Sequence, residues 1–471
     1  MTAVLAALRA AVGTAHVLTE GDLDAYELDW RRRSRGKALA VVRPRSTDEV
    51  AAVMRACAAY GVPVVPQGGN TGLVAGGVPD GSGGQVLLSL RRLDRVREFD
   101  EANLTLTVEA GCVLQAVQEY AAARGLLFPL SLGAEGSCTI GGNLATNAGG
   151  TQVLRYGNAR ELCLGLEVVT AGGEVFSGLS GLRKDNTGYD LRDLYIGSEG
   201  TLGIITAATL KLHPQPAAVM TALAVCDSLE RCVELLQLAQ QRAGAALTGF
   251  EVMNTVSLDL VRQHFPQLRQ PLQAAPWTVL LELSDAESEA HARGVFEALL
   301  ESALERELIG DAAVAETLSQ SHDMWHLRES ISLAQVEEGF NIKHDIALPV
   351  SRIAAFCATV DAELMRHFPG VRLVNFGHLG DGNLHYNLQA PACADSGAWV
   401  KQHEAALTAH VYAAVSAAGG SISAEHGIGA AKLEAMAMHK NGVALGLMRT
   451  LKTALDPQGL LNPGRLLPFP S

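Results

Sequence analysis

Two glycine-rich runs constrain this chain more than any other feature. The first reads Pro66-Gln67-Gly68-Gly69-Asn70-Thr71-Gly72-Leu73, and the second, over residues 136–150, reads GSCTIGGNLATNAGG. Glycine lets a backbone pass close to a ligand, and consecutive exposed N–H groups form a nest that binds anions such as pyrophosphate. Either run alone is most simply a set of tight turns. Two such runs in one stretch of chain favour a dinucleotide site.

Neither run has the spacing of the two commonest nucleotide-binding motifs. The nearest candidate for the nicotinamide motif G-x-G-x-x-G is Gly427-Ile428-Gly429, which carries Lys432 where the third glycine belongs. No G-x-x-x-x-G-K-[ST] occurs in the sequence. A P-loop is therefore excluded.

Size and charge narrow the class of protein. A chain of 471 residues predicts two or three domains, and 48% hydrophobic with 18% charged residues is an ordinary globular balance. The net charge of -13 argues against nucleic acid as a partner. An anionic substrate must therefore be attracted by local cations.

The cysteines and the apolar segments predict a cytoplasmic location. The eight cysteines are scattered without a C-x-x-C pair, which is typical of buried small residues in a reducing compartment. About 18 apolar residues are needed to span a membrane, and no such run occurs. The N-terminus MTAVLAALRAAVG is typical of a short amphipathic helix rather than of a leader peptide.

The pattern of expected strands and helices changes along the chain and predicts an α+β protein. We expect an N-terminal helical segment over 1–35, a region of short strands and turns over 36–214, and a C-terminal segment over 425–471. Over 215–424, strands alternate with amphipathic helices, which indicates one antiparallel sheet with helices on one face. His213-Pro214-Gln215-Pro216 marks the boundary before that sheet, because proline stops both helix and strand.

Four segments make the chain similar to a known family: PQGGNTGL, GSCTIGGNLATNAGG, LRKDNTGYDLRDLYIGSEGTLGIIT and the terminal NPGR. They resemble the vanillyl-alcohol oxidase and p-cresol methylhydroxylase class of FAD enzymes, and within it the D-2-hydroxyacid dehydrogenases, nearest the D-2-hydroxyglutarate dehydrogenases. The resemblance covers about residues 36–465. It implies a p-cresol methylhydroxylase-type FAD-binding domain over 36–214, a substrate (cap) domain over 215–424 and a C-terminal segment that returns to the flavin.

The resemblance also implies which residues hold FAD. We expect contacts from the first loop, the second loop, the SEGTLGII run and the returning tail: Pro66, Gln67, Gly68, Gly69, Asn70, Thr71, Gly72, Leu73, Gly133, Ser137, Gly141, Gly142, Asn143, Thr146, Asn147, Gly149, Gly150, Gly200, Ile205 and Asn462. The first loop has no histidine to carry the flavin covalently, so we expect noncovalent FAD and take Cys138 as a packed small residue. The family usually has lysine where this chain has Arg465.

A second distinctive stretch is GHLGDGNLH, residues 377–385. Asp381-Gly382 is a strong signal for a two-residue type I′ hairpin turn, which would place His378 directly opposite His385. Two imidazoles on one face of a hairpin can chelate one metal ion. On this motif alone, a hairpin with two surface histidines is an equally good interpretation.

A metal site needs a third ligand, and Glu425-His426 offers a carboxylate beside another histidine. Two histidines and a carboxylate suit Zn²⁺ and also Fe²⁺ or Mn²⁺. The family resembled has a zinc-type site at matching positions, which implies His378, His385 and Glu425 as ligands. His426 is then the expected catalytic base and a substrate contact.

The same resemblance implies further substrate-binding residues: Arg328, Ser332, Lys343 and Asn387. Arginine presents a planar fork to a carboxylate, and a lysine adds a point charge. Together they suit the distal carboxylate of a dicarboxylic acid, although either cation could also be a solvated surface charge.

The implied reaction is oxidation of D-2-hydroxyglutarate, or a close D-2-hydroxy acid, to the 2-oxo acid with hydride transfer to flavin N5. D-lactate, D-malate and glycolate remain alternative substrates, and an electron-transfer flavoprotein is the acceptor that the family implies. A metal hydrolase is a weaker interpretation because it gives the glycine runs no task. A noncatalytic flavin-binding subunit is weaker because the His/His/Glu/His set is intact. We also consider a homodimer, although no residue pattern fixes the oligomeric state.

Overall fold

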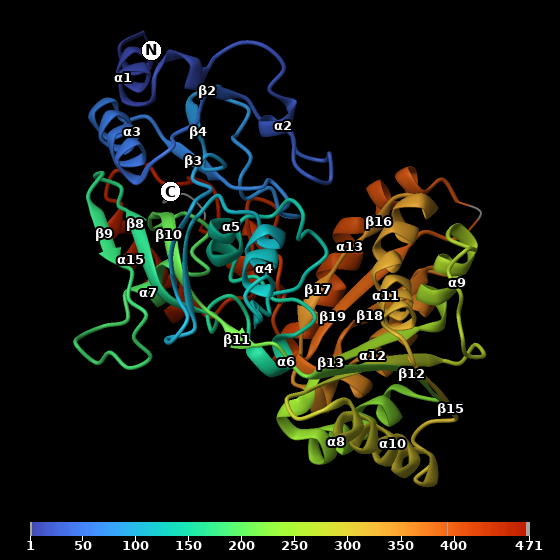
Figure 1. The fold of residues 1–471 in the computed structure, drawn as a ribbon. Helices are drawn as coiled ribbons and strands as arrows, with labels where there is room; N and C mark the ends of the chain where they lie inside the picture. The colour runs from blue at the N-terminus through green and yellow to red at the C-terminus, as the bar shows by residue number, and fades with distance from the viewer. Residues whose placement is uncertain (1, 393, 468–471) are drawn as a thin grey trace. The chain divides into compact units, whose positions relative to one another are not determined.

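The computed structural model describes residues 2–392 and 394–467, and the chain divides into two compact units (Figure 1). Unit 1 contains residues 1–149, 157–214 and 425–471, and unit 2 contains residues 150–156 and 215–424. The α+β class expected from the sequence is confirmed, because both units combine sheets with helices. In the described ranges, no helix is both long and apolar enough to cross a membrane.

Unit 1 is built on two main sheets and a two-stranded ribbon. The first sheet has the order β1-β2-β4-β3, the second has the order β5-β6-β10-β8-β9, and β11 pairs with β7. The helices and strands of unit 1 are α1 (Thr2–Val12), η1 (Thr14–His16), β1 (Val17–Leu18), α2 (Asp24–Glu27), β2 (Ala38–Val42), α3 (Thr47–Tyr60), β3 (Val64–Gln67), β4 (Gln85–Ser89), β5 (Val96–Asp100), β6 (Thr105–Glu109), α4 (Leu114–Ala122), β7 (Leu126–Leu127), α5 (Ile140–Thr146), β8 (Cys163–Val169), β9 (Val175–Gly178), α7 (Arg192–Tyr195), β10 (Ile204–Lys211), β11 (His213–Pro214), α14 (Leu433–His439) and α15 (Gly442–Leu455).

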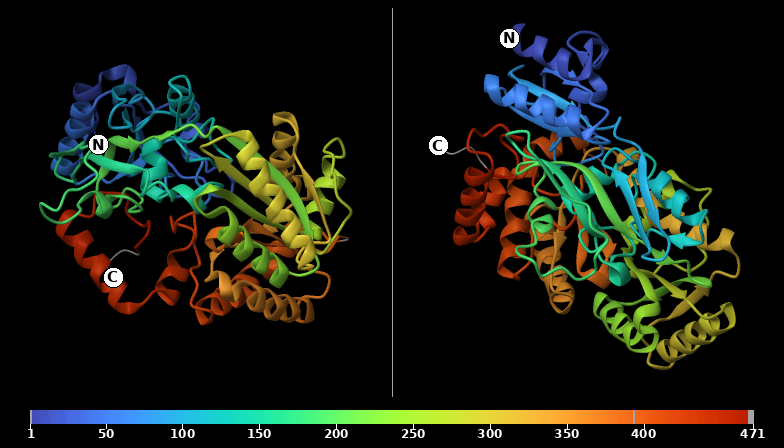
Figure 2. Two further views of the ribbon diagram at one scale, coloured as in Figure 1. Left: turned by 60° about the horizontal axis from the view of Figure 1, so that its bottom comes forward. Right: turned by 60° about the vertical axis from the view of Figure 1, so that its left-hand side comes forward.

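The two ends of the chain both belong to unit 1 (Figure 2). Helices α1 and α3 pack on the first sheet over a core that includes Leu8, Met54 and Leu88. From the C-terminal side, Leu461 joins the same core, and the Lys452 ammonium of α15 donates to the carbonyl of Thr201 at 2.8 Å. The C-terminal segment therefore packs against residues of the first sheet and bonds the loop before β10, both of which lie far earlier in the sequence.

Unit 2 contains one large sheet with the order β15-β12-β14-β13-β18-β19-β16, and β17 also pairs with β19. All of these pairings are antiparallel. The helices and strands of unit 2 are α6 (Val153–Tyr156), β12 (Ala218–Cys226), α8 (Leu229–Ala243), η2 (Gly244–Ala246), β13 (Leu247–Asn254), α9 (Thr255–His264), β14 (Trp277–Asp285), α10 (Glu289–Glu305), β15 (Asp311–Val314), α11 (Leu318–Glu338), β16 (Asn341–Ile342), β17 (Asp345–Ala347), α12 (Val350–His367), β18 (Arg372–His378), η3 (Leu379–Asp381), β19 (Asn383–Gln389) and α13 (Ser396–Ala417).

Helices cover both faces of this sheet, so the expectation of helices on one face is wrong (Figure 1). Met253 of β13 points into an apolar cluster with Val261 of α9 and Leu327 of α11. Its neighbours Phe250 and Val252 are equally buried, and successive strand residues point to opposite faces. Helices α8 and α10 pack against β12, β13 and β14. The sequence pattern failed here because the central strands β12, β13 and β14 are buried on both faces and so lack an alternation of apolar and polar residues.

Candidate functional site

Unit 1 contains a pocket whose wall is made mainly of the two glycine-rich runs. The pocket has an empty volume of about 1000 Å³, which includes space open to solvent. The lining contains fourteen of the residues expected to hold FAD: Pro66, Gln67, Gly68, Gly69, Asn70, Thr71, Gly72, Gly141, Gly142, Asn143, Thr146, Gly200, Ile205 and Asn462. The runs therefore meet in space, as a dinucleotide site requires.

The fit of the two runs depends on the absence of side chains. A Cβ atom on Gly69 would lie 2.1 Å from the carbonyl oxygen of Ser137, whereas a Cβ on Gly72 would meet no atom within 4 Å. The first position needs glycine for close approach of two backbones. Small residues and exposed main-chain groups suit the pyrophosphate and ribose of FAD, so the pocket fits the cofactor that the sequence implies.

The remaining six residues expected at the cofactor are not among those that line this pocket: Leu73, Gly133, Ser137, Asn147, Gly149 and Gly150. Two of them have structural tasks beside it. Ser137 contributes the backbone that Gly69 approaches, and Asn147 ends α5 in the left-handed conformation and accepts a hydrogen bond from the Arg160 N–H at 3.0 Å. Arg465 donates to the carbonyls of Val78 and Pro463.

His426, expected as the catalytic base, also lines the pocket. Other lining residues were missed by the sequence reasoning: Val74, Ala75, Gly76, Gly77, Leu90, Cys138, Thr139, Ala145, Glu199, Gly203 and Ile204. Several of these directly follow or precede the residues that were predicted, so a wider reading of each run would have found them. Cys138 is buried and accepts a hydrogen bond from Asn143 Nδ2 at 3.6 Å, in line with a packed small residue.

Glu199 holds the loop that follows His426. Its carboxylate accepts hydrogen bonds from the backbone N–H groups of Ile428 and Gly429, both at 2.7 Å. Burial raises the pKa of the Glu199 carboxyl, and these two N–H groups oppose that rise. Gly429 has a φ of +52° and approaches the carbonyl oxygen of Val74, so this turn also depends on glycine.

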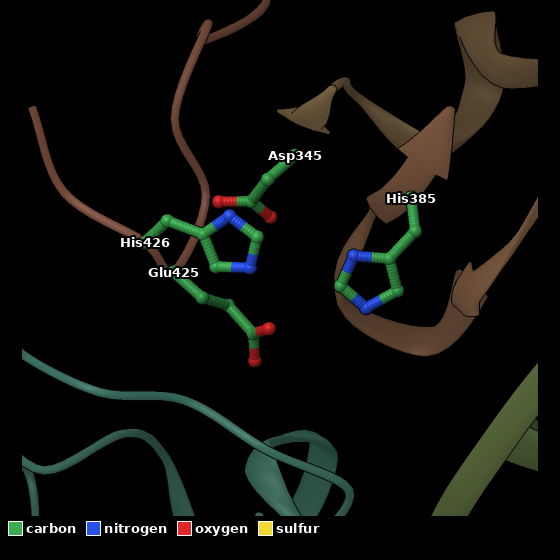
Figure 3. Close-up of side chains that lie close together, drawn as sticks. All are labelled: Asp345, His385, Glu425 and His426. Atoms are coloured by element: carbon green, nitrogen blue, oxygen red, sulfur yellow. The ribbon is translucent and has the colours of Figure 1, made fainter. Parts of the chain in front are cut away.

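Four side chains form a group of candidate metal ligands among the described residues: Asp345, His385, Glu425 and His426 (Figure 3). One ligand atom of each lies within 4.8 Å of those of the others. Asp345 of β17 is directly opposite His385 of β19, which places their side chains on one face of the sheet. Glu425 and His426 follow Ala424, whose backbone N–H donates to Asp345 Oδ2 at 3.2 Å.

This donor set fits a divalent metal. Imidazole nitrogens and carboxylate oxygens are the ligands that Zn²⁺, Fe²⁺ and Mn²⁺ share. Asp345 is also oriented by its neighbours, since Asn383 Nδ2 donates to its Oδ1 at 3.0 Å. The sequence reasoning missed Asp345, although Lys343, two residues earlier in the same stretch, was considered. The missing signal was the pairing of β17 with β19, which no local pattern reveals.

The predicted register of the GHLGDGNLH hairpin is wrong. Phe376, not His378, lies opposite His385, because Leu379–Asp381 form a 3₁₀ turn and Gly382 follows with a φ of +85°. The Leu379 side chain is fully buried, so the turn begins earlier than a two-residue type I′ turn would. The shift is two residues, which keeps His378 and His385 on one face, and their ring centroids are 5.6 Å apart.

His378 is bonded to a buried carboxylate that the sequence did not indicate. Its Nδ1 lies 2.6 Å from Glu251 Oε1, and Arg328 donates to Glu251 Oε2 from Nε at 2.9 Å and from Nη2 at 2.7 Å. Burial would raise the pKa of Glu251, but the charges of His378 and Arg328 and their hydrogen bonds outweigh it and lower the pKa to about 2. Glu251 is therefore ionised at neutral pH.

The other residues expected at the substrate are spread around this region of unit 2. Arg328 is only 6% exposed and also lies over the Phe376 ring, whereas Ser332, one turn later in α11, is exposed. Lys343 is half-buried between β16 and β17. Asn387 is buried and donates to Gln335 Oε1 at 3.0 Å.

Comparison with known proteins decides the family. Residues 38–178 match the FAD binding domain model, and residues 215–466 match the model described as FAD linked oxidases, C-terminal domain. The chain belongs to the FAD-linked oxidase family. As a member of this family it is an FAD-dependent oxidoreductase.

Two relatives extend over nearly the whole chain. The mitochondrial D-2-hydroxyglutarate dehydrogenase of Bos taurus is 40% identical over 98% of this chain and 83% of its own length. The D-2-hydroxyglutarate dehydrogenase of Xanthomonas citri pv. viticola is 39% identical over 98% of this chain and 96% of its own length. The solved structure of p-cresol methylhydroxylase with substrate bound is similar in fold, with a TM-score of 0.76 and 16% identity over 98% of this chain and 96% of that chain. The p-cresol methylhydroxylase-type fold expected from the sequence is therefore confirmed.

Proposed function

We propose that this FAD-linked oxidase oxidises D-2-hydroxyglutarate, or a close D-2-hydroxy acid, to the 2-oxo acid. The observation that carries the proposal is that His426 belongs to two groups of residues. This side chain lines the glycine-rich pocket and also belongs to the group with Asp345, His385 and Glu425. A base at that position would face both the residues that would hold FAD and the residues that would hold a metal. The names of the two relatives support the choice of substrate.

His426 is the proposed catalytic base, since imidazole is the side chain that ordinarily exchanges a proton near neutral pH. It takes the proton of the C2 hydroxyl. His385 and Glu425, which belong to the donor group, and His378, which lies outside it, are the proposed metal ligands, and Asp345 is a further candidate that the group adds. When bound, FAD supplies the acceptor for the C2 hydride, and a divalent metal, with Zn²⁺ as first choice, supplies Lewis acidity toward the hydroxyl.

Selectivity for a dicarboxylate is assigned to Arg328 and Lys343, with Ser332 and Asn387 beside them. Arg328 uses Nε and Nη2 to bond Glu251, so we assign its Nη1 to the distal carboxylate of the substrate. Lys343 adds a second positive charge. These cations lie in a chain with a net charge of -13, where an anionic substrate needs a local positive site.

The substrate is tested with D-2-hydroxyglutarate, D-malate, D-lactate and glycolate under a dye acceptor. We expect the highest kcat/KM for D-2-hydroxyglutarate, and we expect Lys343→Met to lower that value far more than the value for D-lactate. The control is Lys401→Met, an exposed lysine of α13 in the same unit. Faster turnover of D-lactate than of D-2-hydroxyglutarate by the wild type would reject the dicarboxylate.

The acceptor, the assembly and the location complete the proposal. An electron-transfer flavoprotein is the proposed physiological acceptor, and a homodimer the proposed assembly. The cytoplasmic location stays a prediction. A metal hydrolase is not favoured, because the glycine-rich pocket and the family both point to flavin chemistry.

A further inference from the structure

Glu251 is a buried carboxylate in the middle of the sheet of unit 2. It belongs to β13, pairs directly with His378 of β18 in the backbone register, and is 1% exposed. Such burial of a carboxylate costs free energy unless charged partners surround it. Its two oxygens have different partners, since Oε1 meets His378 and Oε2 meets Arg328.

The bond to Nδ1 fixes the state of the His378 ring. A carboxylate at 2.6 Å requires a proton on Nδ1, which leaves Nε2 as the nitrogen able to bind a metal. A carboxylate behind a histidine ligand also sets the ring orientation and raises the basicity of the other nitrogen.

The bonds to Arg328 fix the guanidinium in the same way. Two N–H groups, Nε and Nη2, converge on one oxygen of Glu251, and the guanidinium carbon lies 4.8 Å from the centroid of the Phe376 ring. A guanidinium held on one edge and over one face has little rotational freedom. Its remaining Nη1 edge is therefore held in one direction.

We propose that Glu251 is a positioning residue that serves two sites at once: it orients His378 toward the metal and Arg328 toward the distal carboxylate of the substrate. The inference rests on the proposed function, because it needs a metal at His378 and an acidic substrate at Arg328. Its distinctive consequence is that one substitution weakens metal binding and dicarboxylate selectivity together.

Glu282 offers a matched control on the neighbouring strand β14. It is also buried, and its carboxylate accepts hydrogen bonds from neutral donors: Trp325 Nε1 at 2.7 Å and Thr248 Oγ1 at 3.2 Å. Glu282→Gln removes a buried carboxyl from the same sheet without touching His378 or Arg328. A general loosening of the sheet would affect both variants, whereas a positioning role affects only Glu251→Gln.

The test measures Zn²⁺ affinity of the full-length flavin-loaded protein by competition with a chromophoric chelator. We expect Glu251→Gln to weaken Zn²⁺ binding by about 10–100-fold, the usual effect of losing such a partner, and Glu282→Gln to leave it unchanged. The flavin content should stay at the wild-type level in both variants, because the flavin pocket is lined by residues of unit 1. The ratio of kcat/KM for D-2-hydroxyglutarate to that for D-lactate should fall in Glu251→Gln alone.

If Glu251→Gln does not fold, Glu251→Asp replaces it. The shorter carboxylate keeps the charge but cannot reach both partners, so it should show the same two losses at smaller size. Wild-type Zn²⁺ affinity and wild-type selectivity in either Glu251 variant would overturn the inference and leave the proposed function standing. A wild-type protein that binds no Zn²⁺ would instead overturn the proposed metal site, and this inference with it.

Discussion

The two candidate sites of this protein are made in different ways. The flavin pocket of unit 1 is formed mainly by the backbone of two contiguous glycine-rich runs. The region around His378 and His385 in unit 2 is formed by side chains from strands that are far apart in sequence, since Glu251 and His378 are separated by 127 positions. The first site depends on what is absent, namely Cβ atoms. The second depends on which charged groups meet.

The difference predicts how each site fails. In unit 1, a side chain added where two backbones of the pocket wall meet should destroy flavin binding, and one added away from the pocket should leave it unchanged. In the side-chain site, a substitution should weaken the metal site, the substrate site or, at Glu251, both, and leave the flavin in place.

The largest effect is expected from a side chain at Gly69. Gly69→Val places carbon atoms against the Ser137 carbonyl, which a Cβ would approach to 2.1 Å, so the purified protein should contain no flavin and have no dehydrogenase activity. Gly446→Ala, in α15 of the same unit and outside the lining of the pocket, meets no atom within 4 Å and should keep both. The visible absorbance spectra of the two purified proteins measure their bound flavin. A yellow Gly69→Val protein would contradict the assignment of the pocket.

His426→Ala should give the next largest effect. Loss of a general base lowers kcat by about 10²–10⁴-fold, while bound flavin and bound Zn²⁺ should stay at wild-type levels. His385→Ala is the comparison, because it should lose Zn²⁺ as well as activity. If His426→Ala loses its Zn²⁺ too, His426 is a ligand rather than the base.

Arg328→Ala should destabilise unit 2. It leaves the Glu251 carboxylate buried without its cation, and removing one partner of a buried ion pair costs about 3–5 kcal/mol. Arg293→Ala removes an exposed i,i+4 partner of Glu289 on α10 and should cost about 0–1 kcal/mol. Urea unfolding followed by circular dichroism measures both. An equal loss in the free energy of unfolding for the two variants would show that the buried ion pair stabilises the fold no more than the exposed one.

These predictions also show what the sequence could reveal. The glycine runs were readable because each is continuous and its chemistry is in the backbone. In the side-chain site, Glu425 and His426 were found because they are adjacent, but Asp345 and Glu251 were missed because strand pairing alone brings them to their histidines. The register of the hairpin was predicted wrongly because Leu379 is buried in the core and the turn begins there. The Asp-Gly signal is local and contains no information on core packing.

A smaller effect concerns pH and lies outside both sites. Burial raises the pKa of Asp361 from 3.8 to about 6, despite the hydrogen bond that Tyr386 donates to it. The folded state then holds a proton more tightly than the unfolded state, so the free energy of unfolding should fall as pH rises from about 4 to about 6, by at most about 3 kcal/mol. Asp361→Asn should reduce the dependence of the free energy of unfolding on pH between about pH 4 and 6, as measured by urea unfolding at a series of pH values. Parallel curves for variant and wild type would show that Asp361 titrates normally.

The most direct test of the account is anaerobic reduction of the flavin by D-2-hydroxyglutarate, followed by the loss of its visible absorbance, in metal-loaded and metal-stripped protein. The account predicts that the stripped protein keeps its flavin but is not reduced by the substrate, and that added Zn²⁺ restores reduction. Equally fast reduction after complete metal removal would contradict the claim that the flavin pocket and the His/carboxylate group serve one reaction.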